Sequence, residues 1–265
     1  MRCDKLIEQL EQFAPRSYAC DWDNPGLLVG SSRKEIHKVL IALDVTDAVL
    51  KQAVTEQVDL LLTHHPLIFT PLKQVNDLDF IGRRMLTLVQ HDIAYYAMHT
   101  NFDVAPGGMA DLAAERMGLE EIGILEKTGE VEAVPYGIGK IGCLKVPMSL
   151  QALAQKVKTD FELQFITVYG SGQMKESVSR IAISPGSGKG MAGVALQCGA
   201  QVLITGDIGH HEGIDAVANG LVILDAGHYG LEHIFIDFME SYLPEQVDDR
   251  LLVIKAALEF PAVVW

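Results

Sequence analysis

Two blocks of the sequence end in a histidine that is followed four residues later by a carboxylate. The first block ends in His99-Thr-Asn-Phe-Asp103 and the second in His228-Tyr-Gly-Leu-Glu232. The two histidines and the two carboxylates are separated by the same 129 residues, from 99 to 228 and from 103 to 232. Imidazole and carboxylate groups are the ligands expected for zinc and other divalent metals. The blocks therefore predict metal binding, and their equal spacing indicates an internal duplication.

A pair of adjacent histidines, His64 and His65 in Leu-Leu-Thr-His-His-Pro, adds two further ligands. Successive side chains of a strand point to opposite faces, so neighbours can converge only where the strand ends. Pro66 favours such an ending because it has no amide donor and keeps the preceding residue extended. A carboxylate such as Asp103 or Glu232 can bridge two cations with its two oxygens, and metals about 3.5–4 Å apart are typical of hydrolytic centres.

The remaining histidines leave several interpretations open. His99 is the counterpart of the second block's histidine, so three roles stay open for it: direct metal binding, orientation of a ligand, or an ordinary structural role. His210 and His211 stand where a helix begins, and a place in the site stays open for both. A single histidine beside an apolar strand is more often an ordinary core or surface residue, which is our interpretation of His37 and His91.

Apolar runs and helix-like segments recur in the same order along the chain, with the run at 58–63 repeated 142 residues later at 200–205. In the first set, the apolar runs are 39–43, 58–63 and 93–98, and the expected helices are 47–57 and 108–117. In the second set, the apolar runs are 180–184, 200–205 and 221–226, and the expected helices are 191–198 and 231–242. Strands that alternate with helices predict a parallel sheet covered by helices.

We therefore expect an α/β protein of two similar three-layer α/β/α halves related by internal duplication. The first half would be residues 1–125, with the adjacent histidines and the first block. The second would be residues 126–265, with the second block. In open α/β sheets ligands bind at the carboxyl ends of the strands, so the predicted ligands belong at those ends.

The composition excludes some classes of protein. The chain has 265 residues, a mass of 29.0 kDa and a hydrophobic content of 49%, enough for a substantial core. No apolar run reaches the roughly 18 residues that cross a bilayer, and the start has no signal-peptide core. We therefore expect a cytoplasmic protein with no membrane partner. A formal net charge of −14 disfavours nonspecific nucleic-acid binding, which needs Lys and Arg to neutralise phosphates.

A glycine-rich motif, Gly188-Lys-Gly-Met-Ala-Gly193, has the G-x-G-x-x-G outline of a dinucleotide-binding turn, with Asp207 following 19 residues after its first glycine. With 24 glycines in the chain such a match arises easily, and Lys189 is not followed by the Ser or Thr of a phosphate-binding P-loop. Two interpretations stay open. The amides of Gly188 and Gly190, with Lys189, bind an anion near a helix amino terminus, or the glycines only allow close packing.

Several motifs together resemble a known family. They are Trp22-Asp-Asn-Pro-Gly-Leu-Leu-Val-Gly30, Thr63-His-His-Pro66, His99-Thr-Asn-Phe-Asp103 with Gly107-Gly108, Thr205-Gly-Asp207 and Ala226-Gly-His-Tyr-Gly-Leu-Glu232. In this order they resemble the bacterial proteins named GTP cyclohydrolase 1 type 2 homologues, also called the NGG-interacting-factor-three-like family. Longer relatives carry an inserted domain, and this chain resembles the short form. The resemblance implies two intertwined α/β/α halves, a dinuclear metal centre and a homohexameric ring.

Carried over residue by residue, the family's metal ligands fall on His64, His65, Asp103, His228 and Glu232. The resemblance implies two divalent ions per chain, and this ligand set suits zinc, manganese and iron alike. It also implies a hydrolase in which a metal-activated water attacks a purine nucleotide such as GTP, or a related cyclic amide or phosphoester. No side chain is assigned as catalytic. The alternative is a non-catalytic metal-binding or regulatory protein in which the same ligands are structural.

Overall fold

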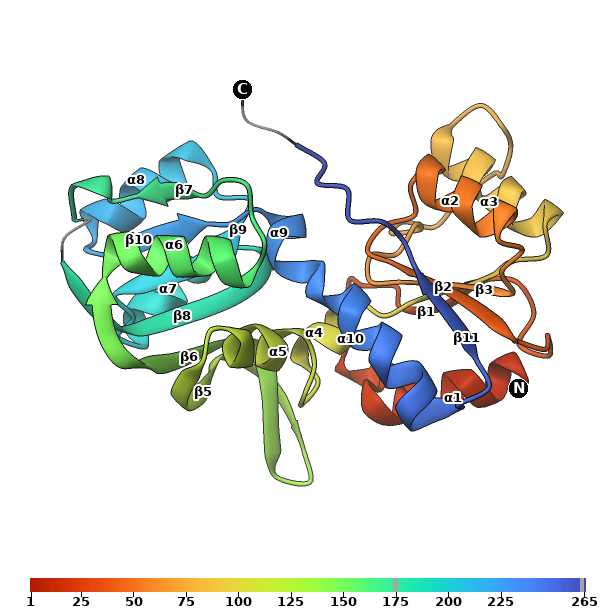
Figure 1. The fold of residues 1–265 in the computed structure, drawn as a ribbon, viewed down its shortest axis with the longest axis horizontal. Coiled ribbons are helices and arrows are strands. Elements are labelled where there is room, and N and C mark those ends of the chain that lie inside the picture. Colours follow the sequence, from red (N-terminus) through yellow and green to blue (C-terminus); the bar gives the residue numbers. More distant parts are fainter. Residues whose placement is uncertain (174–175, 263–264) are drawn as a thin grey trace. The chain divides into compact units, whose positions relative to one another are not determined.

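The chain forms two compact units, each built on one β-sheet (Figure 1). The computed structural model describes residues 1–173, 176–262 and 265. The first unit consists of Met1–Ala105 and Phe235–Leu258, and the second of Pro106–Ile234 and Glu259–Trp265. The predicted α/β class is confirmed. Among the described residues, no helix has the length and apolar character that crossing a membrane requires.

The first unit has a five-stranded sheet of order β1-β4-β3-β2-β11. Its elements are α1 (Cys3–Phe13), a 3-10 turn (Arg16–Tyr18), β1 (Gly26–Val29), β2 (Lys38–Ala42), α2 (Asp47–Thr55), β3 (Leu60–Thr63), α3 (Phe80–Gln90), β4 (Ala94–Ala97), α4 (Thr100–Val104), α10 (Ile234–Tyr242), a π turn (Leu243–Val247) and β11 (Leu252–Lys255). Strands β11, β2, β3 and β4 are parallel, and β1 is antiparallel to β4.

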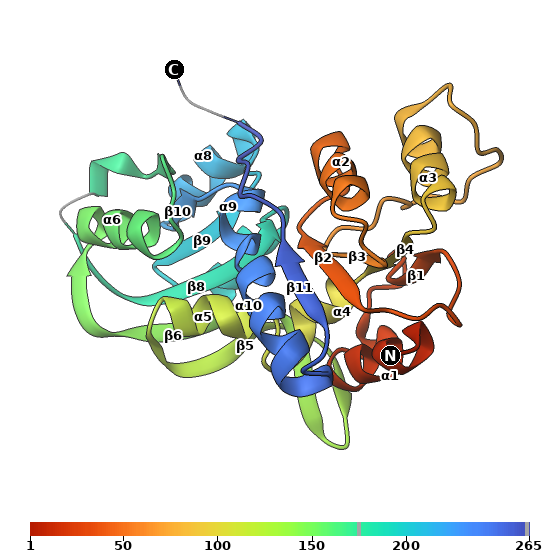
Figure 2. The same ribbon diagram turned by 45° about the vertical axis from the view of Figure 1, so that its right-hand side comes forward.

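The central strands of the first unit are buried along nearly their whole length. Continuous apolar strands are typical of parallel sheets with helices on both faces. Leu50 of α2 and Leu88 of α3 pack with Leu40, Leu61 and Tyr95 on one face. Helices α1 and α10 lie on the other face (Figures 1 and 2). The predicted runs at 39–43, 58–63 and 93–98 are therefore strands of one buried layer.

The second unit has a six-stranded sheet of order β5-β6-β8-β9-β10-β7. Its elements are α5 (Met109–Arg116), β5 (Leu119–Val131), β6 (Val134–Ser149), α6 (Leu150–Asp160), β7 (Thr167–Tyr169), a 3-10 turn (Ser171–Gln173), β8 (Ser177–Ser187), α7 (Met191–Gln197), β9 (Val202–Gly206), α8 (His210–Ala218), β10 (Val222–Asp225) and α9 (His228–Glu232). Strands β8, β9 and β10 are parallel, and β7 is antiparallel to β10.

The two sheets share part of their order. In each, three parallel strands follow one another along the chain, and an antiparallel strand flanks the third, as β1 flanks β4 and β7 flanks β10. An internal duplication would produce this likeness, and the duplication itself stays a prediction. A boundary between halves at 125/126 also stays a prediction. The two compact units are defined by their internal contacts, whereas the predicted halves are defined by duplication of the sequence. Residue 125 lies within β5, which forms a long hairpin with β6.

Candidate metal centre

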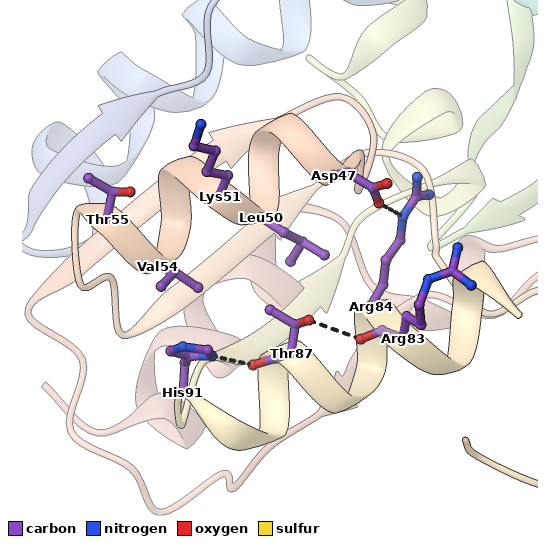
Figure 3. A pocket seen from close by; sticks show the side chains of 9 residues that line it. All are labelled: Asp47, Leu50, Lys51, Val54, Thr55, Arg83, Arg84, Thr87 and His91. Carbon is purple, nitrogen blue, oxygen red and sulfur yellow. Dashed lines mark hydrogen bonds and ion pairs between the residues drawn. The ribbon is translucent and has the colours of Figure 1, made fainter. Parts of the chain in front are cut away.

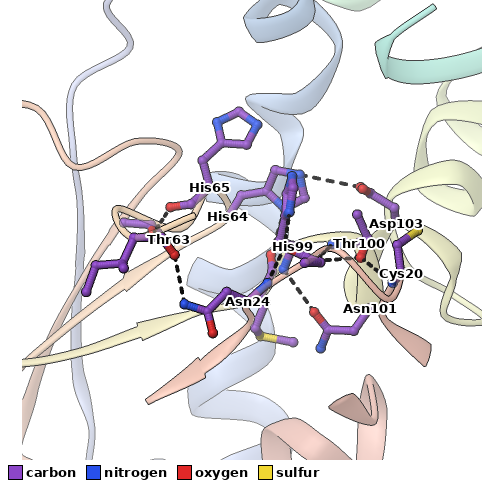
Figure 4. Close-up of polar contacts among 12 residues, drawn as sticks. Cys20, Asn24, Thr63, His64, His65, His99, Thr100, Asn101 and Asp103 are labelled. Carbon is purple, nitrogen blue, oxygen red and sulfur yellow. Dashed lines mark hydrogen bonds and ion pairs between the residues drawn. The ribbon is translucent and has the colours of Figure 1, made fainter. Parts of the chain in front are cut away.

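The ends of β3 and β4 bring three histidines of the first unit together. These strands are parallel neighbours in which Thr63 pairs with Ala97, so the residues that follow each strand meet at one edge of the sheet. His64, His65 and His99 offer ring nitrogens within 4.8 Å of one another, and Figure 4 shows the three rings side by side. The expected convergence of the adjacent histidines beyond the strand end is therefore present.

Asp103 joins this group from α4, one helical turn after His99. Its Oδ1 lies 3.4 Å from Nε2 of His64 (Figure 4). The side chain of His64 is fully buried, whereas that of Asp103 is 24% exposed. Of the five predicted ligands, His64, His65 and Asp103 thus lie together in the first unit.

Each of the adjacent histidines is held through its Nδ1 atom. Nδ1 of His64 lies 2.7 Å from the Met98 carbonyl oxygen, and Nδ1 of His65 lies 2.8 Å from Oδ1 of Asp44. Carbonyl and carboxylate oxygens only accept hydrogen bonds, so each Nδ1 carries the proton. In the neutral ring, Nε2 is then the atom whose lone pair can bind a metal.

His99 is held in the same way by a buried carboxylate. Its Nδ1 lies 2.7 Å from Oδ1 of Asp23, whose side chain is fully buried. The other carboxylate oxygen accepts hydrogen bonds from the amide (3.0 Å) and the hydroxyl (2.5 Å) of Thr100. Burial by itself would raise the pKa of the Asp23 carboxyl, but His99, Thr100 and the Asn24 amide outweigh burial and lower this pKa.

A buried tyrosine fixes the backbone between the histidine pair and the following loop. The Tyr95 hydroxyl donates to the His65 carbonyl (3.0 Å) and accepts from the Leu67 amide (2.8 Å). The Thr63 hydroxyl donates to the same His65 carbonyl at 2.8 Å. Burial raises the pKa of Tyr95, so the phenol keeps the proton that it donates.

The second unit brings the other two predicted ligands together at the ends of β9 and β10. His228 and Glu232 lie one turn apart on α9, with Nε2 and Oε2 separated by 3.0 Å. Nδ1 of His228 lies 2.8 Å from Oδ2 of Asp207, which follows β9 directly. Glu232 is buried, whereas the His228 side chain is 32% exposed. The helix predicted at 231–242 begins earlier, as α9, and both ligands lie on it.

Two glycines allow the backbone to pack closely against His228 and Glu232. A Cβ atom at Gly186 would lie 2.6 Å from Oε1 of Glu232, and the φ of +80° at this residue also favours glycine. A Cβ atom at Gly206 would lie 2.4 Å from the His228 amide nitrogen. The backbone of β8 and β9 therefore approaches α9 more closely than any side chain would allow.

The glycine-rich motif between β8 and α7 has direct packing contacts. The Gly188 amide donates to a carbonyl of β9 at 2.8 Å, and the Gly190 amide donates to Oε1 of Glu212 at 2.7 Å. A Cβ atom at Gly188 would lie 2.5 Å from the Thr205 side chain. These contacts support the packing interpretation. Binding of an anion by Gly188, Lys189 and Gly190 stays a prediction.

Of the other histidines, His233 is buried, with its Nε2 2.9 Å from the Phe161 carbonyl oxygen, and the remaining four lie at the surface. His37 is exposed beside Asp59, and His91 follows α3 with its Nδ1 2.9 Å from the Thr87 carbonyl. His210 and His211 begin α8 and are exposed.

A groove of about 420 Å³ lies between α2 and α3 (Figure 3). Arg84 donates from Nε to Oδ1 of Asp47 at 2.7 Å, and this hydrogen bond lowers the pKa of the Asp47 carboxyl. The residues that line the groove are Asp47, Leu50, Lys51, Val54, Thr55, Arg83, Arg84, Thr87 and His91. The predicted ligands are not among them.

Sequence reasoning missed the carboxylates that hold the imidazoles. Asp44 precedes His65 by 21 residues, and Asp207 precedes His228 by the same 21 residues. This repeated spacing was a signal in the sequence. Asp23 had no such signal, because it lies 76 residues from its partner His99.

The glycine contacts predict the effect of one added methyl group. Gly186→Ala should displace the Glu232 carboxylate and lower the metal bound by the purified protein, because the new Cβ would collide with Oε1. Gly193→Ala is the matched control, since a Cβ atom there meets nothing within 4 Å. Elemental analysis of both variants measures the difference. Equal metal content in the two would contradict this role for Gly186.

The carboxylates that hold the imidazoles predict a second effect. Asp44→Asn and Asp207→Asn should each weaken metal binding by roughly 10- to 100-fold, because an amide holds the ring less firmly than a carboxylate does. Asp92→Asn serves as the control, since the Asp92 side chain is 88% exposed. Titration with Zn²⁺ against a competing chelator measures the affinity. Wild-type affinity in both variants would show that these carboxylates do not support the site.

Comparison with known proteins places the chain among its relatives. The model of the family Duf34/NIF3 (NGG1p interacting factor 3) matches residues 1–259. A GTP cyclohydrolase 1 type 2 homolog from Streptococcus pneumoniae serotype 4 is 34% identical over 252 residues, which are 94% of this chain and 93% of that protein. The homolog from Bacillus subtilis aligns over 349 positions, more than the 265 residues of this chain, so this chain is a shorter form.

The fold is also found in a solved structure. The Bacillus cereus protein related to NIF3 superimposes with a TM-score of 0.93 at 25% identity, covering 100% of this chain and 99% of that chain. The family match over nearly the whole chain, the relative at 34% identity and this superposition lead to one conclusion. The chain belongs to the Duf34/NIF3 family.

Proposed function

We propose that this chain is a dinuclear metal-dependent hydrolase. Its metal ligands would be His64, His65, Asp103, His228 and Glu232, and they would hold two divalent cations. The observation that carries the proposal is the orientation of the imidazoles. In all three ligand histidines Nδ1 lies within hydrogen-bonding distance of an oxygen acceptor, so Nε2 is the ring atom that would bind a metal.

The donor set fits this assignment. Imidazole nitrogens and carboxylate oxygens bind zinc, manganese and iron, and these three metals are the candidates. The carboxylates of Asp103 and Glu232 each lie beside a histidine Nε2, at 3.4 and 3.0 Å. Such close donor pairs are what one cation needs to bind both groups at once. His99 offers a further Nε2 in the first unit, as a ligand or as a group that orients one.

Bound cations would supply Lewis acidity, lowering the pKa of water and polarising the substrate. The chain's own residues would provide the geometry for this chemistry. Asp44 and Asp207 would keep two imidazoles from rotating, and Asp23 would do the same for His99. The side chains of Asp103 and His228 are 24% and 32% exposed, which supports a site that a substrate can reach.

The substrate class follows from the relatives' names. Several are named GTP cyclohydrolase 1 type 2 homolog, so we propose a purine nucleotide, or a related cyclic amide or phosphoester, as the small-molecule substrate. Gly188, Lys189 and Gly190 stay proposed contacts for its anionic group. Of the three, Lys189 supplies the positive charge.

Replacement of ligands tests the proposal. His65→Ala and Glu232→Ala should each lower the bound metal from two ions toward one or none per chain. Both variants should stay folded, because His65 lies beyond the end of β3 and Glu232, although buried, lies at the end of the short helix α9 beside the polar side chain of His228. Elemental analysis and circular dichroism measure the two properties. His37→Ala is the control, since that exposed imidazole lies outside the proposed site.

Turnover distinguishes the hydrolase from a non-catalytic metal protein. Chelation should abolish hydrolysis of GTP or of a cyclic amide or phosphoester in a substrate panel, and added Zn²⁺, Mn²⁺ or Fe²⁺ should restore it. A protein that regains two metal ions but turns over no member of the panel would support the non-catalytic alternative and contradict the hydrolase.

We also propose that the protein assembles as a homohexamer. Closed rings of identical subunits are common among soluble oligomers. Light scattering should then give a mass six times the 29.0 kDa of the chain. A monomer at micromolar concentration would contradict the assembly.

A further inference from the structure

Two large aromatic side chains of the first unit are exposed beside the histidine cluster. Trp22 is 63% exposed and Phe69 is 47% exposed. Their ring planes are nearly parallel, at 17°, with centroids 6.5 Å apart. The two exposed, near-parallel rings present apolar surface to solvent. Because burying an aromatic side chain is favourable, a ligand that covered these rings would gain binding free energy.

Both rings contact the imidazole of His99. The Trp22 centroid lies 5.8 Å from that of His99 at an interplanar angle of 73°, and the Phe69 centroid lies 5.6 Å away at 90°. Each is therefore an edge-to-face contact with a ring of the histidine cluster. A molecule that reached the cluster next to His99 would meet these two aromatic rings.

Three consecutive residues fix this arrangement. Trp22 supplies one ring, and Asp23 holds the His99 imidazole through Nδ1. Asn24 donates from Nδ2 to the carbonyl of Ile68 at 2.8 Å, which ties the segment to the residue before Phe69. The backbone segments that carry the two aromatic rings are thus tied to each other and to His99 before any ligand binds, and preorganisation of this kind lowers the entropic cost of binding.

We propose that Trp22 and Phe69 form a stacking platform that selects substrates with a planar aromatic or heteroaromatic ring. This inference rests on the proposed function, because the ring would belong to the molecule on which the metal centre acts. Every planar heterocycle has a π face that stacks on aromatic side chains, so the platform recognises the ring's shape and not its substituents. It would make Trp22 and Phe69 specificity-determining residues.

The affinities of two related probes test the platform. GTP and inorganic tripolyphosphate both carry a triphosphate, but only GTP has a ring. Trp22→Ala and Phe69→Ala should each weaken GTP binding by between about five-fold and about 150-fold, the range for removing one base–aromatic stack. Tripolyphosphate affinity and metal content should not change. Calorimetry of the metal-loaded full chain measures both affinities.

Matched variants separate stacking from general loss of apolar surface. Trp22→Phe keeps an aromatic face and should retain most of the GTP affinity. Phe80→Leu should have no effect, because Phe80 is 52% exposed in the segment that follows Phe69 but packs against Arg84. The chain has two tryptophans, so in a Trp265→Phe background the fluorescence of Trp22 alone should change on GTP binding.

The outcomes distinguish the platform from the hydrolase. If ATP or flavin mononucleotide binds with the same dependence on Trp22 and Phe69 while no substrate is turned over, the platform stands and the hydrolase fails. Wild-type affinity for all three ring compounds in both alanine variants overturns the platform, as does a wild-type protein that binds none of them. If the alanine variants lose mass in light scattering, the rings form a contact between copies of the chain, and the platform is again overturned.

Discussion

The candidate centre depends on hydrogen bonds that hold imidazole rings by their Nδ1 atoms. An unrestrained histidine can rotate and can exchange its proton between its two nitrogens, whereas a ring with Nδ1 on a fixed oxygen presents only Nε2. The oxygens come from the Met98 carbonyl for His64 and from carboxylates for the other rings. Because the same restraint is repeated in the two units, the orientation of the ligands is a property of the fold and not of one loop.

These restraints have a cost that the surrounding structure must offset. A buried carboxylate loses its hydration, and Asp23 recovers stability only through its hydrogen bonds to His99 and Thr100 and to the Asn24 amide. In the second unit, the positions of the proposed ligands depend instead on close backbone packing. Gly186 and Gly206 allow two strands to approach the helix that carries His228 and Glu232. Residues that bind no metal therefore decide where the proposed ligands lie.

The sequence predicted the parts of the structure that depend on local patterns. The runs at 39–43, 58–63 and 93–98 were recognisable because strands buried on both faces are continuously apolar. The ending of β3 was recognisable from Pro66. The hairpin of β5 and β6 was not recognised, because long strands with one exposed face lack a continuous apolar run. The return of 235–258 to the first unit was also missed, since it depends on the pairing of β11 with β2, far apart in the chain.

In the site, too, features set by short sequence motifs were predicted, whereas features set by tertiary packing were not. The adjacent histidines and the two spaced blocks are short motifs, and sequence alone singled them out. Asp23 is hydrogen-bonded to His99, which lies 76 residues later in the sequence, and the contact of Trp22 with Phe69 also joins segments that are distant in the sequence. Such pairs are created by tertiary packing, so they leave no local pattern.

In the proposed centre, oriented imidazoles and carboxylates bind a pair of metal ions. X-ray diffraction from crystals of the metal-loaded protein, recorded at the absorption edge of the bound metal, tests this claim most directly. We expect two anomalous peaks roughly 3.5–4 Å apart, coordinated through Nε2 of His64, His65 and His228 and through the carboxylates of Asp103 and Glu232. A single peak, or coordination through Nδ1 or through other residues, would contradict the account.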